Sequence, residues 1–434
     1  MILHKLNLAN FRAFEQIEIE FVRDLNVIAG VNGVGKTAIL DAIAVMFSRA
    51  LPECTVSTAK PRSFTDDDIS VGEISMEVSG IYSVGNQRFH AVTQRTAETE
   101  KGDLFLQMPE LHHPTDAPEA RQETRTVLHG LKSAANQPIA VLFPPGRLLR
   151  GRPQRLHKPD LADKTRAFIG ALDEERTVEL REFMEWFYAQ AELEKQREEA
   201  HEAESQKQII EALKRVVKEF IPEFSNLRVV YDPKPRFLVD KSKTPLQLSQ
   251  LSDGERGLLA IVFDITRRLT IANPERSDPI SEGTGIVLID EIELHLHPKW
   301  QREALRRLHN TFSGCQFIVT THSPQVLGEV DAQCVRYLYR DRENRVQKYT
   351  PKQALGLDSN SILEGIMGAP ARNIETEDFL HDLFRAIDRE NPSDVQALMD
   401  RISQRLGDSD PELVRARSII SFLSGQNEEH HEEH

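Results

Sequence analysis

One eight-residue segment restricts the fold of this 434-residue chain more than any other. Residues 30–37 read GVNGVGKT and match the pattern G-x-x-x-x-G-K-[ST]. A short apolar run at residues 25–29 precedes the segment, and residues from about 36 to 49 have the pattern of a helix. A glycine-rich turn between a strand and a helix N-terminus directs backbone N–H groups toward phosphate oxygens. The sequence therefore predicts an α/β fold with a nucleotide-phosphate site.

The residue types within this segment suit the parts of a bound nucleoside triphosphate. Glycine permits the close backbone approach that the phosphates require. We expect the Lys36 ammonium to reach the β- and γ-phosphates and the Thr37 hydroxyl to bind Mg²⁺. The predicted nucleotide-contacting residues are Gly30, Asn32, Gly33, Gly35, Lys36 and Thr37.

A second segment, GIVLIDE at residues 285–291, supplies the acids that such a loop requires. The apolar run from Ile286 to Ile289 predicts a strand that is buried on both faces. Asp290 would emerge at the carboxyl end of this strand, where α/β sheets bind ligands, as the acid on the Mg²⁺ side. Glu291 follows directly and is the candidate general base that orients the attacking water.

A third segment, TTHS at residues 320–323, follows the apolar run CQFIV. A lone histidine is more often a core or surface residue than a catalytic one. His322, however, follows a second buried-type strand, where a group that senses the γ-phosphate would lie. We therefore predict a catalytic role for His322 together with Glu291.

The overall charge argues against a chain whose main task is to coat nucleic acid. The formal net charge is −14, whereas such proteins are usually basic. Residues 146–166 are a local exception, and the segment is either a solvated loop, an intramolecular phosphate contact or a contact with nucleic acid. Its basic residues are Arg147, Arg150, Arg152, Arg155, Lys158, Lys164 and Arg166.

Other features of the composition favour a cytoplasmic protein without a membrane segment. No apolar run approaches the roughly 20 residues that span a bilayer. Residues 1–14 lack the pattern of an export signal. Cys54, Cys315 and Cys334 lack metal-binding spacing and suit a reducing compartment.

The patterns along the chain divide it into five parts. The N-terminal part alternates like β-strands around the phosphate loop, except for a polar, turn-rich stretch at residues 96–137 that we expect to be a surface excursion. A helical pattern runs from about residue 172 to residue 220, and Pro222 ends it. The predicted parts are a first lobe at 1–145, a basic segment and helical insertion at 146–222, a second lobe at 223–350, an all-helical region at 351–427 and a disordered tail at 428–434.

The ordered motifs LNLANFRAF, GVNGVGKT, LSDGE, LIDE and TTHS together resemble the ATP-binding-cassette (ABC-type) ATPases, and within them the RecF/SMC-like branch. The resemblance implies a P-loop ATPase head with a mixed sheet and an antiparallel β subdomain, and it implies ATP and Mg²⁺ as cofactors. It places Arg12 near the base and the α-phosphate, and His322 at the switch position. His295 to His297 fall where the family has a segment that crosses the dimer seam.

The segment LSDGE, residues 251–255, has the position of the family's signature motif, which contacts the γ-phosphate held by a second copy. The resemblance therefore implies that Ser252, Gly254 and Glu255 contact nucleotide, and that the chain forms a homo-oligomer through composite ATP sites. The residues agree, because Ser252 and the amides of a helix start form an anion site. We assign no segment to the family's glutamine loop.

The segments EIELHLHPKWQREALRRL and QFIVTTHSPQVLGEV are similar, more narrowly, to single-chain bacterial ATPases such as the Septu antiphage ATPase PtuA, which also occur with retrons. That resemblance implies regulation of a separate, PtuB-like HNH nuclease, with the helical region at 351–427 as the partner-binding part. Two other classes remain open: a DNA-repair ATPase that binds DNA through residues 146–166, and the motor subunit of a transporter. The NFRAF start and the LSDGE segment favour the soluble branch over the transporter.

Overall fold

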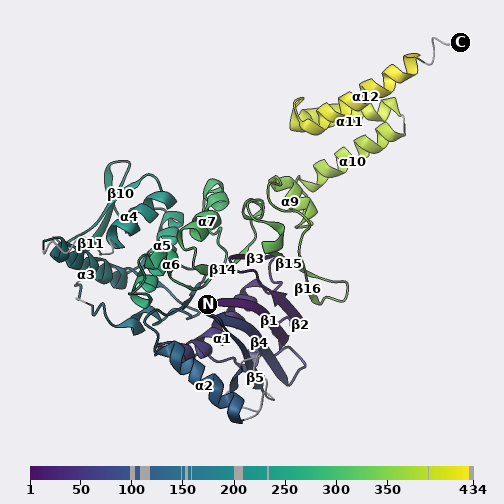
Figure 1. Ribbon diagram of the computed structural model, residues 1–434. Helices are drawn as coiled ribbons and strands as arrows, with labels where there is room; N and C mark the ends of the chain where they lie inside the picture. The colour runs from purple at the N-terminus through teal and green to yellow at the C-terminus, as the bar shows by residue number, and fades with distance from the viewer. Residues whose placement is uncertain are drawn as a thin grey trace. The chain divides into compact units, whose positions relative to one another are not determined.

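The computed structural model describes residues 1–97, 103–107, 118–147, 149–151, 155–157, 159–199, 209–231, 234–389 and 391–429. The chain divides into two compact units, Met1–Asp358 and Ser359–His434. Figure 1 labels their helices and strands, and each unit is described by itself.

A six-stranded sheet lies at the centre of the first unit. Its strands are β3 (Leu25–Gly30), β7 (Ile139–Phe143), β13 (Gly285–Ile289), β14 (Cys315–Thr321), β15 (Val335–Arg340) and β16 (Val346–Tyr349). The order is β16-β15-β3-β14-β13-β7, with all neighbours parallel except β16 at the edge. The apolar runs predicted at residues 25–29 and 286–289 both lie in this sheet, as expected for parallel strands covered on both faces.

A five-stranded antiparallel sheet forms the β subdomain that the family resemblance implied. Its strands are β1 (Ile2–Phe11), β2 (Phe14–Glu20), β4 (Ser75–Val84), β5 (Gln87–Thr96) and β6 (Asp103–Gln107), in the order β2-β1-β4-β5-β6. The alternation in β2 corresponds to its two faces: Ile17 and Ile19 are buried, whereas Glu18 and Glu20 are exposed.

Helix α1 (Lys36–Cys54) packs against strands of both sheets (Figure 1). Its buried residues share one core with Leu6 and Phe89 of the antiparallel sheet and with Ile28 and Ile318 of the mixed sheet. A helix enclosed in this way is apolar around most of its circumference, which explains why α1 continues to Cys54 rather than ending near residue 49.

The described part of the stretch at residues 96–137 is not the surface excursion that the sequence predicted. It contains β6 and helix α2 (Pro118–Lys132), and α2 packs on α1. Val127, Leu128 and Leu131 join the main core. Three apolar residues at helical spacing in a polar segment are a weak periodic signal, which is why the pattern did not reveal this helix.

In the residues described between 172 and 220, where a helix was expected, a short strand precedes two helices. Strand β9 (Val178–Glu179) pairs with β8 (Leu149–Arg150), and helices α3 (Leu180–Glu199) and α4 (Ile209–Phe220) follow. Helix α4 ends before Pro222, as predicted. Residues 200–208 lie outside the described residues.

The part of the chain that was predicted to be the second lobe contains a small sheet and the helix that begins in LSDGE. Strands β10 (Phe224–Val230), β11 (Arg236–Lys241) and β12 (Thr244–Gln247) are antiparallel. Helix α5 (Asp253–Ala272) follows and is buried along nearly its whole length. The remaining helices of this unit are α6 (Pro279–Glu282), α7 (Pro298–Thr311) and α8 (Pro324–Leu327).

The second unit is helical. Its helices are α9 (Ser359–Gly365), α10 (Ile374–Asp388), α11 (Pro392–Leu406) and α12 (Pro411–Glu429), and the last three share a core around Leu383 and Leu413. Asn391-Pro392 precedes the body of α11, and Gly407 to Pro411 separates α11 from α12. Residues 430–434 of the predicted disordered tail lie outside the described residues. In the part of the chain that is described, no helix has the length and apolar character needed to cross a membrane.

Candidate functional site

The phosphate loop connects the carboxyl end of β3 to the first turn of α1. The Lys36 ammonium turns back over the loop and donates to the carbonyl oxygens of Gly30 and Val31, both at 3.0 Å. Lys36 is only 6% exposed, whereas Asn32 and Gly33 are exposed. Burial lowers the pKa of Lys36, and the carboxylates nearby oppose this shift. The loop therefore fixes a cation at the start of a helix, where phosphate groups bind.

Gly35 adapts the loop to the antiparallel sheet. Its φ is +107°, and a Cβ there would lie 2.6 Å from Cζ of Phe14. Phe14 is buried at the start of β2. A side chain at position 35 would be strained and would also collide with Phe14, so the position requires glycine.

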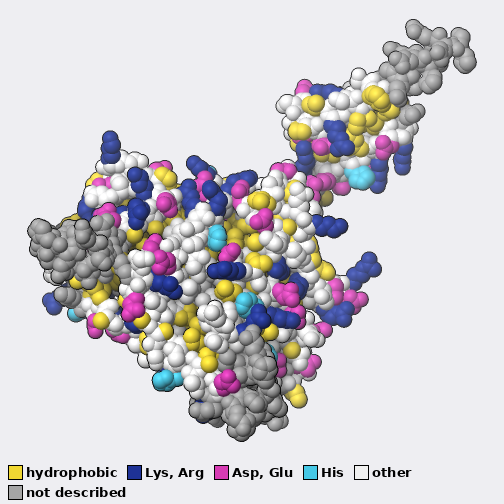
Figure 2. Space-filling model, viewed as in Figure 1, with side chains coloured by type: hydrophobic (Ala, Val, Ile, Leu, Met, Phe, Trp, Pro, Cys, Tyr) yellow, Lys and Arg dark blue, Asp and Glu magenta, His cyan; other side chains and the backbone are white. Residues whose placement is uncertain are grey.

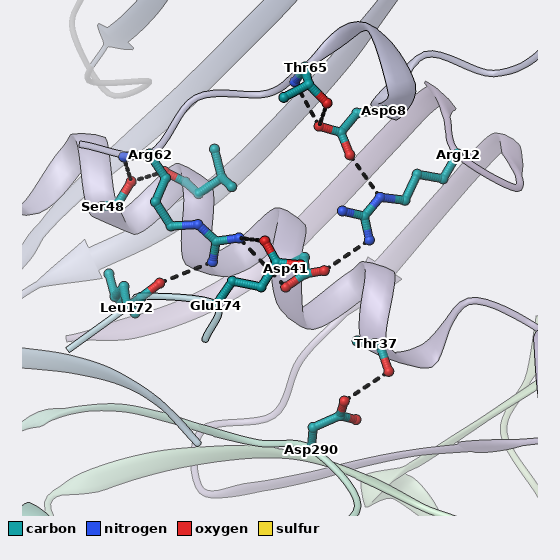
Figure 3. Close-up of polar contacts among 11 residues, drawn as sticks. Arg12, Thr37, Asp41, Ser48, Arg62, Thr65, Asp68, Leu172, Glu174 and Asp290 are labelled. Atoms are coloured by element: carbon teal, nitrogen blue, oxygen red, sulfur yellow. Dashed lines mark hydrogen bonds and ion pairs between the residues drawn. The ribbon is translucent and has the colours of Figure 1, made fainter. Parts of the chain in front are cut away.

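The Thr37 hydroxyl donates to Oδ2 of Asp290 across 2.8 Å (Figure 3). Asp290 follows β13 and is 3% exposed, and its other carboxylate oxygen accepts a hydrogen bond from the Thr320 hydroxyl. The parallel register of β13 and β14 brings Asp290 and Thr320 side by side. Hydroxyl and carboxylate oxygens are the ligand types that Mg²⁺ prefers, so this pair fits that ion.

Glu291 lies in a strained turn directly after Asp290. Its φ is +47°, and its N–H donates to Oγ1 of Thr320 at 2.8 Å. Non-glycine residues in the left-handed region occur preferentially at functional sites. The Glu291 side chain is partly accessible.

Arg147 holds the backbone of this turn. Its guanidinium donates to the carbonyl oxygens of Asp290, Glu291 and Ile292 at 2.6, 2.8 and 3.1 Å. Arg147 is 4% exposed, and burial lowers its pKa to about 10, which leaves it cationic near neutral pH. The structure therefore corrects the interpretation of Arg147 as part of a solvated or nucleic-acid-binding loop.

The other basic side chains of residues 146–166 lie in different environments. Lys164 donates to the carbonyl oxygen of Ala135 at 2.7 Å, so its ammonium also serves the chain itself. Arg155 is exposed. Arg152 and Lys158 lie outside the described residues.

His322 lies next to Lys36. Its Nδ1 atom is 3.4 Å from the Lys36 Nζ atom. Burial, followed by the charge of Lys36, lowers the pKa of His322. Because an ammonium can only donate, Nδ1 must act as the acceptor, and the neutral ring then carries its proton on Nε2.

Glu293 fixes the backbone before His322, and the sequence analysis did not identify it. Its two carboxylate oxygens accept from the His322 N–H at 2.5 Å and from the Thr321 hydroxyl at 2.8 Å. A signal was present, because Glu293 is a third acid within four residues of Asp290. The sequence pattern alone did not show that it would pair with the next strand.

Arg12 joins the antiparallel sheet to α1. Its guanidinium pairs with Asp41 at 2.9 Å and with Asp68 at 2.8 Å (Figure 3). Burial acts against these contacts, but together they raise the pKa of Arg12. A cavity of about 480 Å³ adjoins Arg12 and is also lined by Arg62 and Phe64. The contact between Arg12 and the nucleotide stays a prediction.

The signature segment caps α5. The Ser252 hydroxyl donates to Oε2 of Glu255 at 2.9 Å and accepts from the Glu255 N–H at 3.3 Å. Ser252 is exposed, whereas Glu255 is buried and pairs with Lys241 at 2.6 Å. Burial raises the pKa of Glu255, but these contacts outweigh it and the pKa is lowered.

The start of α5 also packs against the segment predicted to cross the dimer seam. A Cβ on Gly254 would lie 2.4 Å from the carbonyl oxygen of His295, so no larger residue fits there. His297 caps α7, because its Nδ1 accepts from the Lys299 N–H at 3.3 Å. In the described part of the chain, no group of three or more His, Cys, Asp or Glu side chains is arranged to hold a metal ion.

Comparison with known proteins identifies the family to which this chain belongs. The family described as "AAA domain" matches residues 5–226, just over half of the chain. A second AAA-domain family, whose description also names the AbiEii toxin and a type IV TA system, matches residues 150–328. A solved SMC head, bound to the C-winged helix domain of ScpA, is similar at a TM-score of 0.46 and 16% identity, over 81% of this chain and 98% of that one.

Several individual proteins are also similar to this chain in sequence. The Retron Ec83 probable ATPase of Escherichia coli is 40% identical over 46% of this chain and 37% of its own length. Septu protein PtuA of Bacillus mycoides (strain KBAB4) is 24% identical over 93% of this chain and 50% of its own length. PtuA of Bacillus thuringiensis is 21% identical over 95% of this chain and 96% of its own length. The chain thus spans half or less of the length of the first two of these relatives. It belongs to the AAA-domain family, and it resembles Septu protein PtuA and the Retron Ec83 probable ATPase.

Proposed function

We propose that this chain binds and hydrolyses ATP at the phosphate loop. The observation that carries the proposal is the 2.8 Å contact between Thr37 and Asp290. It joins the hydroxyl of one motif to the acid of another, directly beside the buried Lys36. This is the combination that phosphate-loop enzymes use to hold a triphosphate and its metal.

In this proposal the chain's own groups bind the nucleotide, orient the attacking water and accept its proton. Loop N–H groups and Lys36 bind the phosphates. When bound through Thr37 and Asp290, Mg²⁺ supplies charge neutralisation at the phosphate oxygens. Glu291 accepts the proton of the attacking water. His322, neutral and protonated on Nε2, donates a hydrogen bond to the γ-phosphate.

The ATP site is proposed to be completed by a second copy. Ser252 is exposed at the N-terminus of α5, where a serine hydroxyl and helix amides can hold an anion. The γ-phosphate would join the loop of one copy to the signature segment of the other. Hydrolysis would remove that link and release the pair.

The biological role we propose is antiphage defence in the cytoplasm, through a separate HNH nuclease that the ATPase restrains or licenses. The likeness to Septu and retron proteins supports this role. The helical region at 351–427 is the proposed partner-binding part.

Two measurements test the proposal. Purified wild-type chain should hydrolyse ATP, and Lys36→Ala should lose both nucleotide binding and turnover, while the exposed-site control Lys60→Ala should keep both. Tagged chain should also co-purify with the product of the neighbouring gene. Equal turnover in wild type and Lys36→Ala would refute the assignment of the site, and failure to retain any HNH protein would refute the proposed partner.

Direct DNA binding through residues 146–166 has less support. Arg147 and Lys164 bond to the chain's own carbonyl groups. Figure 2 shows acidic and basic side chains interspersed among the described residues of the visible face, rather than a continuous basic field. A salt titration of DNA binding decides between the two functions, since phosphate contacts give a steep dependence on salt.

A further inference from the structure

The buried carboxylate of Glu255 makes its contacts in two directions. Its Oε1 atom accepts from the Lys241 ammonium at 2.6 Å. Its Oε2 atom accepts from both the N–H and the hydroxyl of Ser252, each at 2.9 Å. The Glu255 side chain is 4% exposed, so a charge that lost its partners there would be costly.

A tight hairpin brings Lys241 to this position. Lys241 pairs with Thr244 across the two-residue turn Ser242-Lys243, which connects β11 to β12. Both turn residues have positive φ, 48° and 73°, although neither is glycine. A two-residue turn with this twist is the favoured connection between antiparallel strands, but it normally takes glycine or asparagine. The strain therefore suggests that the hairpin's geometry matters near the signature segment.

Ser252 cannot donate its hydroxyl proton to Glu255 and to a phosphate at the same time. A hydroxyl has one proton, and Ser252 donates it to Glu255. An ionised phosphate oxygen only accepts, so contact with a γ-phosphate requires that this proton turn away from Glu255. The incoming phosphate is then a second anion next to a buried carboxylate, and the repulsion is strong where water is excluded.

We propose that Lys241 is a positioning residue of the composite ATP site. It keeps the charge of Glu255 paired while Ser252 turns its hydroxyl from Glu255 to the γ-phosphate held by a second copy of the chain. The inference rests on the proposed function and deepens it. It adds a cation from the β11–β12 hairpin, outside the signature segment itself.

The parent for the test is the 434-residue chain carrying Glu291→Gln, which should retain ATP. Self-association is measured by sedimentation at increasing protein concentration, in the presence and absence of Mg-ATP. Lys241→Met should weaken ATP-dependent association by about tenfold or more, as expected for a lost charged hydrogen bond. Lys241→Arg, which keeps the charge, should stay within about threefold of the parent. Lys243→Met, at the exposed tip of the same hairpin, is the matched control and should associate like the parent.

A double variant separates positioning from hairpin folding. Glu255→Gln removes the negative charge but keeps an acceptor, so Lys241→Met combined with Glu255→Gln should recover most of the lost association. Binding of a fluorescent ATP analogue to dilute chain should stay unchanged in each variant. Thermal unfolding of Lys241→Met should shift to lower temperature, because the buried Glu255 carboxylate loses its cation, and should return toward the parent value in the double variant. Unimpaired association of Lys241→Met, or no recovery in the double variant, would overturn the role of Lys241 alone. A parent that does not associate with ATP would overturn the composite site and this inference with it.

Discussion

Thr37 and Asp290 are hydrogen bonded across 2.8 Å although they lie 253 positions apart in the chain. The contact joins the first turn of α1 to the end of β13, so it exists only when the helix and the mixed sheet are assembled. A ligand held by both residues would bind the folded chain and not the unfolded one. Binding and folding stability are therefore coupled at this pair.

The first prediction concerns this coupling. Saturating Mg-ATP should raise the melting temperature of the wild-type chain, because a ligand at 100 times its dissociation constant adds about 2.7 kcal/mol to the free energy of unfolding. Asp290→Asn should lose most of the magnesium-dependent part of this shift. Differential scanning fluorimetry with ATP, with and without Mg²⁺, measures it. Equal shifts for wild type and Asp290→Asn would remove Asp290 from the metal side.

A second prediction tests Glu291 as the general base. Glu291→Gln should keep ATP binding, reduce turnover by at least about 100-fold, and stabilise the ATP-dependent dimer, because an amide cannot accept the proton of water. Phosphate release and sedimentation measure the two effects. Glu275→Gln, at an exposed acid beyond the end of α5, is the control. Turnover of Glu291→Gln within about twofold of wild type would exclude the base role.

A third prediction tests Ser252 at the signature position. Ser252→Arg should block ATP-dependent association while leaving nucleotide binding to the dilute chain nearly intact, since the exposed N-terminus of α5 is filled by a long cationic side chain. Ser277→Arg is the matched control, because Ser277 is also exposed but follows the opposite end of this 20-residue helix. Association that persists in Ser252→Arg would mean that the signature segment is not part of the ATP interface.

Local patterns in the sequence predicted the buried strands and the phosphate loop, whereas the mixed sheet was implied by the family resemblance. Buried strands are continuous apolar runs, and the loop requires glycine at a position such as 35, where a neighbouring ring leaves no room for a side chain. The contacts that hold the site together could not be predicted from the sequence. Arg147 and Glu293 act on backbone groups of segments that become neighbours only in the fold, and a charge in a polar segment does not identify its partner. Helix α2 was missed because tertiary packing, not periodicity, defines its apolar side.

A fourth prediction follows from the corrected interpretation of Arg147. Arg147→Met should lower the free energy of unfolding by about 2–4 kcal/mol, because it leaves three carbonyl groups of the 290–292 turn without their donor. Denaturant unfolding measures this loss. Arg155→Met, at an exposed arginine of the same basic segment, should change stability by less than about 0.5 kcal/mol. An unaltered stability of Arg147→Met, with a weakened salt-dependent DNA affinity, would instead favour the nucleic-acid function.

The fifth prediction concerns pH and His322. Burial and the charge of Lys36 lower the pKa of His322, so the neutral ring persists below the ordinary histidine value of 6.5. Because the unfolded chain then binds the proton more readily than the folded one, the contribution of His322 to stability is complete above pH 6.5. This contribution is lost as the pH falls from 6.5 through the folded-state pKa.

Turnover should accordingly stay constant from about pH 8 to below pH 6.5 and then fall as the ring becomes protonated. The measurement is kcat against pH at saturating Mg-ATP for wild type and His322→Gln. The variant should be slower and should lack this acid limb, since glutamine does not titrate. An identical limb in both proteins would show that His322 is not the titrating group.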